Sequence, residues 1–145
     1  MTEPIARLSL VTLGVRDLAR STAFYEALGF CRRSRGYDGV AFFEAGGVIL
    51  SLWPIEELIK DTEIASSEPG SFRGMSLAWN CISAEEVDVV LAKAVEAGAT
   101  PVRSAKRVFW GGYTAYFADF DGHLWEVAYN PHFPFSADGR LLVPE

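Results

Sequence analysis

The sequence predicts an α+β fold built from two modules in one chain, each with the strand and helix order β-α-β-β-β. Three observations predict it. The same order of patterns occurs in both halves, a polar and turn-rich segment separates them, and a stretch of one half resembles a stretch of the other. The expected boundaries are a first module over residues 1–53, a linker with a short helix over 54–73, a second module over 74–131 and a C-terminal tail over 132–145.

The first half opens with a strand and a helix. Residues 7–15 alternate in polarity and contain β-branched side chains, which is typical of a strand. Asp17 is suited to cap a helix, and Gly29 stands where a glycine commonly ends one. Three short strands are then expected at 30–37, 39–45 and 47–53, separated by glycine-containing turns.

The second half repeats this order. Residues 75–82 are strand-like, and Ser83 with Glu86 three residues later forms a capping box. An amphipathic helix that ends at Gly98 follows, because apolar residues recur at helical spacing at Val87, Val90, Leu91, Ala94 and Val95. Further strands are expected at 101–109, 112–119 and 123–130, with turns at WGGY and FDGH.

A direct sequence repeat supports the duplication. Residues 41–54 (AFFEAGGVILSLWP) align with residues 115–131 (AYFADFDGHLWEVAYNP). The alignment places Phe42 on Tyr116, Gly47 on Gly122 and Ser51 on Glu126. Two copies are too few for a solenoid, so we expect two sheets that curve around a shared space.

Composition limits the classes of partner. The 145 residues are 50% hydrophobic and 13% aromatic, as in a globular protein, and the formal net charge is −6 with a pI of about 4.9. An acidic protein is poorly suited to bind nucleic acid or an anionic membrane. The N-terminus does not resemble a signal peptide, and Cys31 and Cys81 form no CxxC pair. We therefore expect a reduced, cytoplasmic protein with no nucleic-acid or membrane partner.

Strand alternation predicts a pocket in the shared space. Successive side chains of a strand point to opposite faces, and Val11, Leu13 and Val15 form the better helix-facing set of the first strand. Small polar groups among apolar walls are typical of a small-molecule site. The residues expected to line it are Leu10, Thr12, Ile49, Ser51, Trp53, Ser76, Asn80 and Glu126.

Glu126 is the unusual member of this set, because it interrupts the apolar run LWEVAY. A buried carboxylate needs a cation, a hydrogen-bond network or a raised pKa. One interpretation is a catalytic or binding acid that contacts a ligand amine or transfers a proton. The alternative is a structural acid hydrogen-bonded to Ser51, Ser76 or Asn80.

Aromatic residues on the strands are candidates for pocket walls, although core packing is the favoured interpretation for each. They are Trp53, Phe43, Trp110, Tyr113 and Phe117. Trp110 and Tyr113 flank a Gly-Gly turn, where their rings could form a lid or a dimer contact. The chain has no GxGxxG, P-loop, GxSxG or HExxH motif, which argues against nucleotide-binding, serine-hydrolase and zincin functions.

Three stretches resemble the vicinal oxygen chelate superfamily, which includes glyoxalase I, extradiol dioxygenases and bleomycin-resistance proteins. They are VTLGVRDLARSTAFYEALGF, SLAWNCISAEEVDVVLAKAVEAGAT and VFWGGYTAYFADFDGHLWEVAYNP, and they extend over about residues 7–135 in the family's order. The resemblance implies paired βαβββ modules that form a curved, half-barrel-like mixed sheet. It also implies a homodimer.

The metal enzymes of this superfamily carry His and Glu ligands on the first and last strands of each module. Those places fall on Leu10, Ser51, Ser76 and Glu126, and a one-residue slip would replace Ser76 by Met75 or Leu77. Only Glu126 matches, whereas a catalytic metal needs about three protein ligands. His123 and His132 do not complete the set from their sequence positions. We therefore expect no metal and no other cofactor.

These observations favour a glyoxalase/bleomycin-resistance-like protein that binds a small organic molecule in a metal-free or degenerate pocket. The acidic charge and the aromatic content suit a cationic, planar ligand. The alternative is a metal-dependent glyoxalase I-type lyase or extradiol-type dioxygenase that uses Glu126 and ligands that the sequence does not identify. A dimeric scaffold with a filled interior is a third interpretation.

Overall fold

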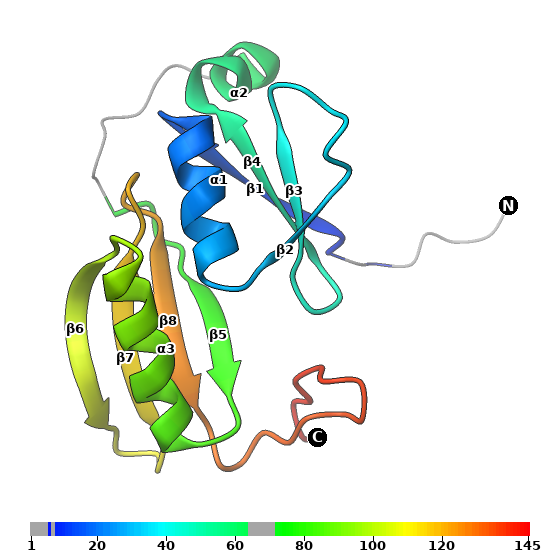
Figure 1. Ribbon diagram of the computed structural model, residues 1–145. Coiled ribbons are helices and arrows are strands. Elements are labelled where there is room, and N and C mark those ends of the chain that lie inside the picture. Colours follow the sequence, from blue (N-terminus) through cyan, green and yellow to red (C-terminus); the bar gives the residue numbers. More distant parts are fainter. Residues whose placement is uncertain (1–5, 7, 64–71) are drawn as a thin grey trace, which may run out of the picture.

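The protein, seen here in a computed structural model, contains two modules of the same architecture (Figure 1). The structure describes residues 6, 8–63 and 72–145, so most of the expected polar linker and the extreme N-terminus lie outside the described residues. The elements are β1 (Leu10–Val15), α1 (Leu18–Ala27), β2 (Cys31–Arg33), β3 (Ala41–Glu44), β4 (Ile49–Pro54), α2 (Ile55–Thr62), β5 (Leu77–Cys81), α3 (Ala84–Glu96), β6 (Thr100–Arg107), β7 (Tyr113–Ala118) and β8 (Leu124–Tyr129). The predicted two-module α+β fold is confirmed.

Each module contains a four-stranded mixed sheet. The strand orders are β1-β4-β3-β2 and β5-β8-β7-β6, with the first strand parallel to the last strand of its module and the remaining pairs antiparallel. The internal repeat has a structural counterpart in the register. Phe42 pairs with Ser51 across β3 and β4, and Tyr116 pairs with Glu126 across β7 and β8. The sequence alignment therefore matched equivalent positions of the two sheets.

Local signals explain the helix boundaries. The side chain of Asp17 accepts a hydrogen bond of 3.0 Å from the Arg20 amide, which caps α1. Ser83 caps α3 in the same way through the Glu86 amide, and the Glu86 carboxylate accepts from the Ile82 amide at 2.7 Å. In a standard capping box the Glu86 carboxylate would accept from the amide of the cap residue Ser83. Here it accepts from the preceding amide, that of Ile82, so the second bond is shifted by one residue.

β2 is shorter than predicted, because the chain turns directly after Arg33. Ser34 adopts a left-handed conformation with φ of 51°, which ends the extended backbone. The other strands begin and end within three residues of their predicted positions.

One hydrophobic core joins both modules. Leu13 and Val15 of β1 face it, as alternation predicted, and Phe43 and Phe117 are fully buried in it. Figure 1 shows α1 lying between the first sheet and the second module, where Tyr25 on this helix contacts Trp125 of β8. Of the aromatic residues considered as pocket walls, Phe43 and Phe117 are therefore confirmed as core residues.

The opposite face of the first sheet is partly covered by α2. A Cβ atom on Gly14 would lie 2.4 Å from the Ile55 side chain, so the absence of a side chain lets α2 approach β1 closely. No helix in the described parts of the chain is long and apolar enough to cross a membrane.

Candidate functional site

The first sheet brings five of the predicted pocket residues onto one face. Parallel pairing of β1 and β4 sets Leu10 beside Ile49 and Thr12 beside Ser51, with Trp53 two residues further along β4. Ser51 is buried, whereas Leu10 is 41% exposed. The polar centre of this face is therefore sheltered, and its open end is apolar.

The second sheet carries two of the remaining three residues, Glu126 and Asn80. Glu126 lies on β8 beside Ala78 of β5, and Asn80 lies two residues along β5 on the same face. Ser76 precedes β5, which begins at Leu77, and it is exposed. Alternation from an earlier strand start placed Ser76 within the pocket, but the structure leaves it outside the paired strand.

Glu126 is half-buried and hydrogen-bonded by a tyrosine of the neighbouring strand. The Tyr116 hydroxyl donates to Glu126 Oε2 at 3.0 Å, because the β7–β8 register sets the two residues opposite each other. Ser51, Ser76 and Asn80, the partners considered from sequence, do not form this hydrogen bond. The polar contact of Glu126 thus comes from within its own sheet.

Arg103 of β6 extends this row on the same face. Its guanidinium carbon lies 5.1 Å from the centre of the Tyr116 ring, and the group donates to the Thr114 carbonyl at 3.1 Å and to the Thr114 hydroxyl. Among the described residues Arg103 makes no ion pair with Glu126. The row therefore contains a cation, a phenol and a carboxylate, with the phenol between the two charges.

The charge state of the phenol follows from its surroundings. Burial raises the pKa of Tyr116, and the hydrogen bond and negative charge of Glu126 raise this pKa further, while Arg103 lowers it in part. Tyr116 is therefore protonated at neutral pH and acts as the donor to Glu126. This bond engages Oε2 of the carboxylate.

A divalent metal has few ligands available here. No group of three or more His, Cys, Asp or Glu side chains that could hold a metal ion occurs among residues 8–63 and 72–145. His123 Nε2 lies 2.8 Å from the Gly14 carbonyl, and His132 Nε2 lies 3.2 Å from the Trp110 carbonyl. Both histidines of the chain are thus engaged with backbone groups away from Glu126.

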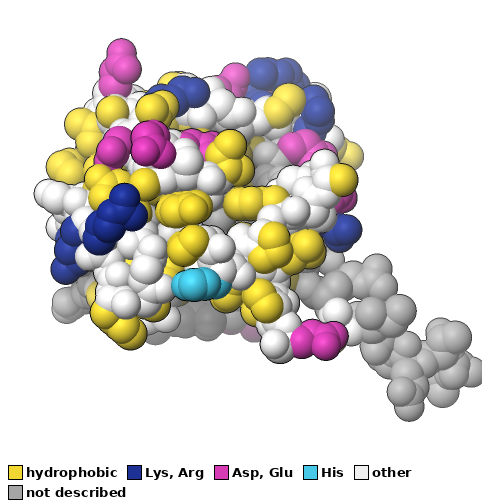
Figure 2. Space-filling model, turned by 90° about the horizontal axis from the view of Figure 1, so that it is seen from below, with side chains coloured by type: hydrophobic (Ala, Val, Ile, Leu, Met, Phe, Trp, Pro, Cys, Tyr) yellow, Lys and Arg dark blue, Asp and Glu magenta, His cyan; other side chains and the backbone are white. Residues whose placement is uncertain are grey.

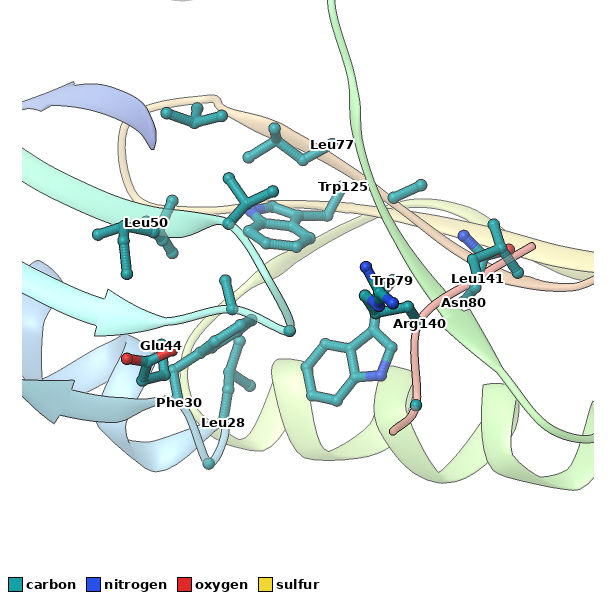
Figure 3. A pocket seen from close by; sticks show the side chains of 18 of the residues that line it. Leu28, Phe30, Glu44, Leu50, Leu77, Trp79, Asn80, Trp125, Arg140 and Leu141 are labelled. Atoms are coloured by element: carbon teal, nitrogen blue, oxygen red, sulfur yellow. The ribbon is translucent and has the colours of Figure 1, made fainter. Parts of the chain in front are cut away.

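The larger described cavity lies elsewhere, between the two modules and the C-terminal tail. It has a volume of about 580 Å³, and Ile49 and Asn80 of the predicted pocket line it. Its walls also include Phe30, Trp79 and Trp125 (Figure 3). The pocket predicted from the sequence did not include them, because alternation puts Trp79 and Trp125 on the strand faces opposite to Asn80 and Glu126, and Phe30 precedes β2.

A smaller cavity of about 130 Å³ contains Thr12 of the predicted set, beside Leu124 and α2. Leu10, Ser51, Trp53, Ser76 and Glu126 line neither of these two cavities. The predicted residues are therefore divided between two sheet faces and two cavities within this chain.

The paired modules define a two-module α+β protein that carries a row of polar side chains on one face of its second sheet. The sequence profile of the Glyoxalase/Bleomycin resistance protein/Dioxygenase superfamily matches residues 7–127, and the chain belongs to this superfamily. No curated protein was found that matches the sequence.

Solved structures support the same assignment. A glyoxalase-related enzyme from Fulvimarina pelagi is 34% identical with a TM-score of 0.87, and the match covers 97% of this chain and 100% of that one. A glyoxalase/bleomycin resistance protein/dioxygenase from Nocardioides is 28% identical with a TM-score of 0.72, covering 88% and 85% of the two chains. The fosfomycin resistance protein FosX from Listeria monocytogenes is 26% identical with a TM-score of 0.68, covering 88% and 95%.

Proposed function

We propose that the protein binds a small, planar organic cation at the face of the second sheet around Glu126, without a resident divalent metal. One observation carries this proposal. Glu126 is the only metal-binding residue type at the four ligand places of the family, and its carboxylate is held by the Tyr116 hydroxyl.

A cationic ligand follows from the charge that is left unmatched at this face. The half-buried Glu126 carboxylate has a neutral hydrogen-bond donor in Tyr116, but no cation at ion-pair distance among the described residues. The nearby Arg103 is engaged with Thr114. A partly desolvated carboxylate gains from a positive partner.

A second copy of the chain completes the pocket in this proposal. β1 and β5 are free edges of their sheets, and apolar side chains stand exposed beside them, among them Leu8, Leu10 and Met75. Figure 2 shows hydrophobic side chains spread over the middle of one face of the molecule. Exposed apolar groups of this kind mark interaction surfaces, so a homodimer would shelter the sheet faces from water.

The printed names of relatives suggest a role in resistance to a small molecule, because FosX is described as a fosfomycin resistance protein and the superfamily name includes bleomycin resistance. Binding without turnover would suffice for such a role. A metal-dependent reaction would instead require ligands that a partner chain supplies to Glu126.

Calorimetric titration with proflavine, a planar aromatic cation, tests the proposal. The experiment uses the full chain in buffer with EDTA, and compares wild type with Glu126→Gln and with the control Glu96→Gln, an exposed acid that lines neither cavity. We expect binding in EDTA that weakens about fivefold or more in Glu126→Gln only, the order expected of a partly exposed charge pair. Binding that requires a divalent ion, or that is equal in all three proteins, would overturn the proposal.

A further inference from the structure

The cavity of about 580 Å³ is not lined by Glu126, since it opens between the modules and beneath the C-terminal tail, and of the second-sheet residues on the Glu126 face only Asn80 and Ala78 of β5 reach it. Its volume lies within the range of about 300–1,000 Å³ that is usual for small-molecule sites. Its lining is drawn from β1 and the residues before it, the turn after α1, the turn between β3 and β4 with the start of β4, β5, β8 and the tail. Segments distant in sequence thus converge on one space.

The middle of the cavity is aromatic. The ring centre of Phe30 lies 5.4 Å from that of Trp79 and 5.7 Å from that of Trp125, with the rings steeply inclined. Trp125 is buried and supported by the stacked ring of Phe117 beneath it. Inclined, well-supported rings present rigid apolar surfaces, which favour a planar apolar ligand over a flexible one.

The polar groups are distributed unevenly. Figure 3 shows Glu44 toward one end of the cavity, with Phe30, and Arg140 and Asn80 toward the other end. The partner of Arg140 among the described residues, Asp138, contacts its Nε at 3.1 Å, and no described residue engages its two Nη groups. The half-buried Asn80 carboxamide likewise has no hydrogen-bond partner in the described part of the chain.

The end of the cavity at Arg140 and Asn80 therefore offers hydrogen-bond donors from a guanidinium and an amide. A planar carboxylate matches such donors, because guanidinium groups bind carboxylates with two parallel hydrogen bonds. Glu44 at the opposite end disfavours a second negative charge on the ligand. The charge pattern consequently selects a monoanion and sets its orientation.

The tail holds Arg140 in position. The Ser136 amide donates to the Arg140 carbonyl at 2.8 Å and the Leu142 amide donates to the Pro134 carbonyl at 2.8 Å, which close a short hairpin. The Arg140 side chain passes over the turn between β3 and β4, with its Cδ 3.6 Å from where a Cβ of Gly47 would lie. The arginine stem therefore lies within van der Waals reach of this turn.

We propose that this cavity is a second ligand site, which takes a planar aromatic monocarboxylate with its carboxylate on Arg140 and Asn80 and its ring system against Phe30, Trp79 and Trp125. The proposal is independent of ligand binding at Glu126. It also differs from that site in the charge of the ligand.

Calorimetric titration of the full chain with 2-naphthoate tests this site. The neutral 2-naphthamide and the cationic 2-naphthylmethylamine serve as matched ligands. The matched variants are Arg140→Gln and Arg35→Gln, because each arginine is more than 60% exposed and forms one ion pair of 3.1 Å with an acid. We expect 2-naphthoate to bind the wild type most tightly. Arg140→Gln should weaken its binding about fivefold, and Arg35→Gln should leave it unchanged.

A second pair of variants separates this site from the Glu126 face. Asn80→Asp keeps the side-chain size but replaces a donor by a negative charge, and should weaken 2-naphthoate binding at least as much as Arg140→Gln. Glu126→Gln should leave it unchanged. Equal affinity for the three naphthalene ligands, or no effect of Arg140→Gln, would overturn the proposal. Loss of 2-naphthoate binding as the protein dimerises would also overturn it, because a second copy would then occupy the cavity.

Discussion

The Tyr25 hydroxyl donates a hydrogen bond of 2.6 Å to Asp119 Oδ2, and so joins α1 of the first module to the turn before β8 of the second. Both side chains are buried. The same hydroxyl accepts a hydrogen bond of 3.2 Å from Trp125 Nε1, and Asp119 Oδ1 accepts from the amides of Asp121 and His123 at 2.9 Å. A single phenol thus connects the fixed turn, the core tryptophan and the helix.

Tyr25→Phe should lower the free energy of unfolding by about 2 kcal/mol, because it leaves a buried carboxylate oxygen and an indole N–H without this partner. Urea denaturation measures the change. Tyr37→Phe is the control, since Tyr37 is 63% exposed, its ring lies against Phe42, and its hydroxyl makes no hydrogen bond among the described residues. Equal stability of the two variants would show that the Tyr25 hydroxyl does not hold the modules together.

The stability should decrease at alkaline pH. Burial and the negative charge of Asp119 raise the pKa of Tyr25 well above its ordinary value. The unfolded chain releases this proton near pH 10 while the folded chain keeps it, so the unfolded state binds fewer protons and the unfolding free energy falls as pH rises above about 10. Urea midpoints measured from about pH 8 to about pH 11 should show this fall, with a smaller slope in Tyr25→Phe. The pKa of Tyr116 is also raised, so the slope should not vanish.

Gly98 should be less tolerant of alanine than Gly139. Both glycines have positive φ, 112° and 85°, which costs an alanine about 1–2 kcal/mol. Only Gly98 would also place its Cβ 2.8 Å from the Phe120 ring, whereas nothing lies within 4 Å of a Cβ on Gly139. We expect Gly98→Ala to cost at least about 1 kcal/mol more than Gly139→Ala in thermal unfolding. Equal losses would mean that the Phe120 ring moves aside freely.

The two cysteines should differ in reactivity. Cys31 is exposed, whereas Cys81 is buried, and burial together with the charge of Glu86 raises the pKa of the Cys81 thiol to about 12. Because the thiolate is the reactive form, iodoacetamide at about pH 8 should modify Cys31 in the native protein and spare Cys81. Peptide mass spectrometry measures both sites, and modification in urea is the control. Comparable native modification of Cys81 would contradict its buried placement.

Much of the fold was predictable because its signals are local. Asp17 and Ser83 cap the helices as their positions indicated, and the alternation of β1 correctly sent Leu13 and Val15 into the core. The repeat even matched Ser51 with Glu126, which occupy equivalent cross-strand pairs. Local propensity and side-chain period sufficed for these features.

The partners of Glu126 depend on long-range register. The FDGH turn sets Tyr116 opposite Glu126, and counting back from that turn would have identified this pair. The position of Arg103 was harder to predict from the sequence, because β6 contains register shifts on both sides of it that interrupt simple alternation. Arg140 reaches its cavity through a hairpin of the tail, for which the sequence offers no periodic signal.

We propose above all that Glu126 binds its ligand without a resident metal, because Tyr116 engages the carboxylate and no other metal ligands converge on it among the residues that the structure describes. The most direct test is elemental analysis of the purified full chain after incubation with zinc, manganese and nickel ions and gel filtration. It should be run on wild type and on Glu126→Ala. The account predicts far less than one ion per chain in both proteins. One ion per chain in the wild type that is lost in Glu126→Ala would contradict it.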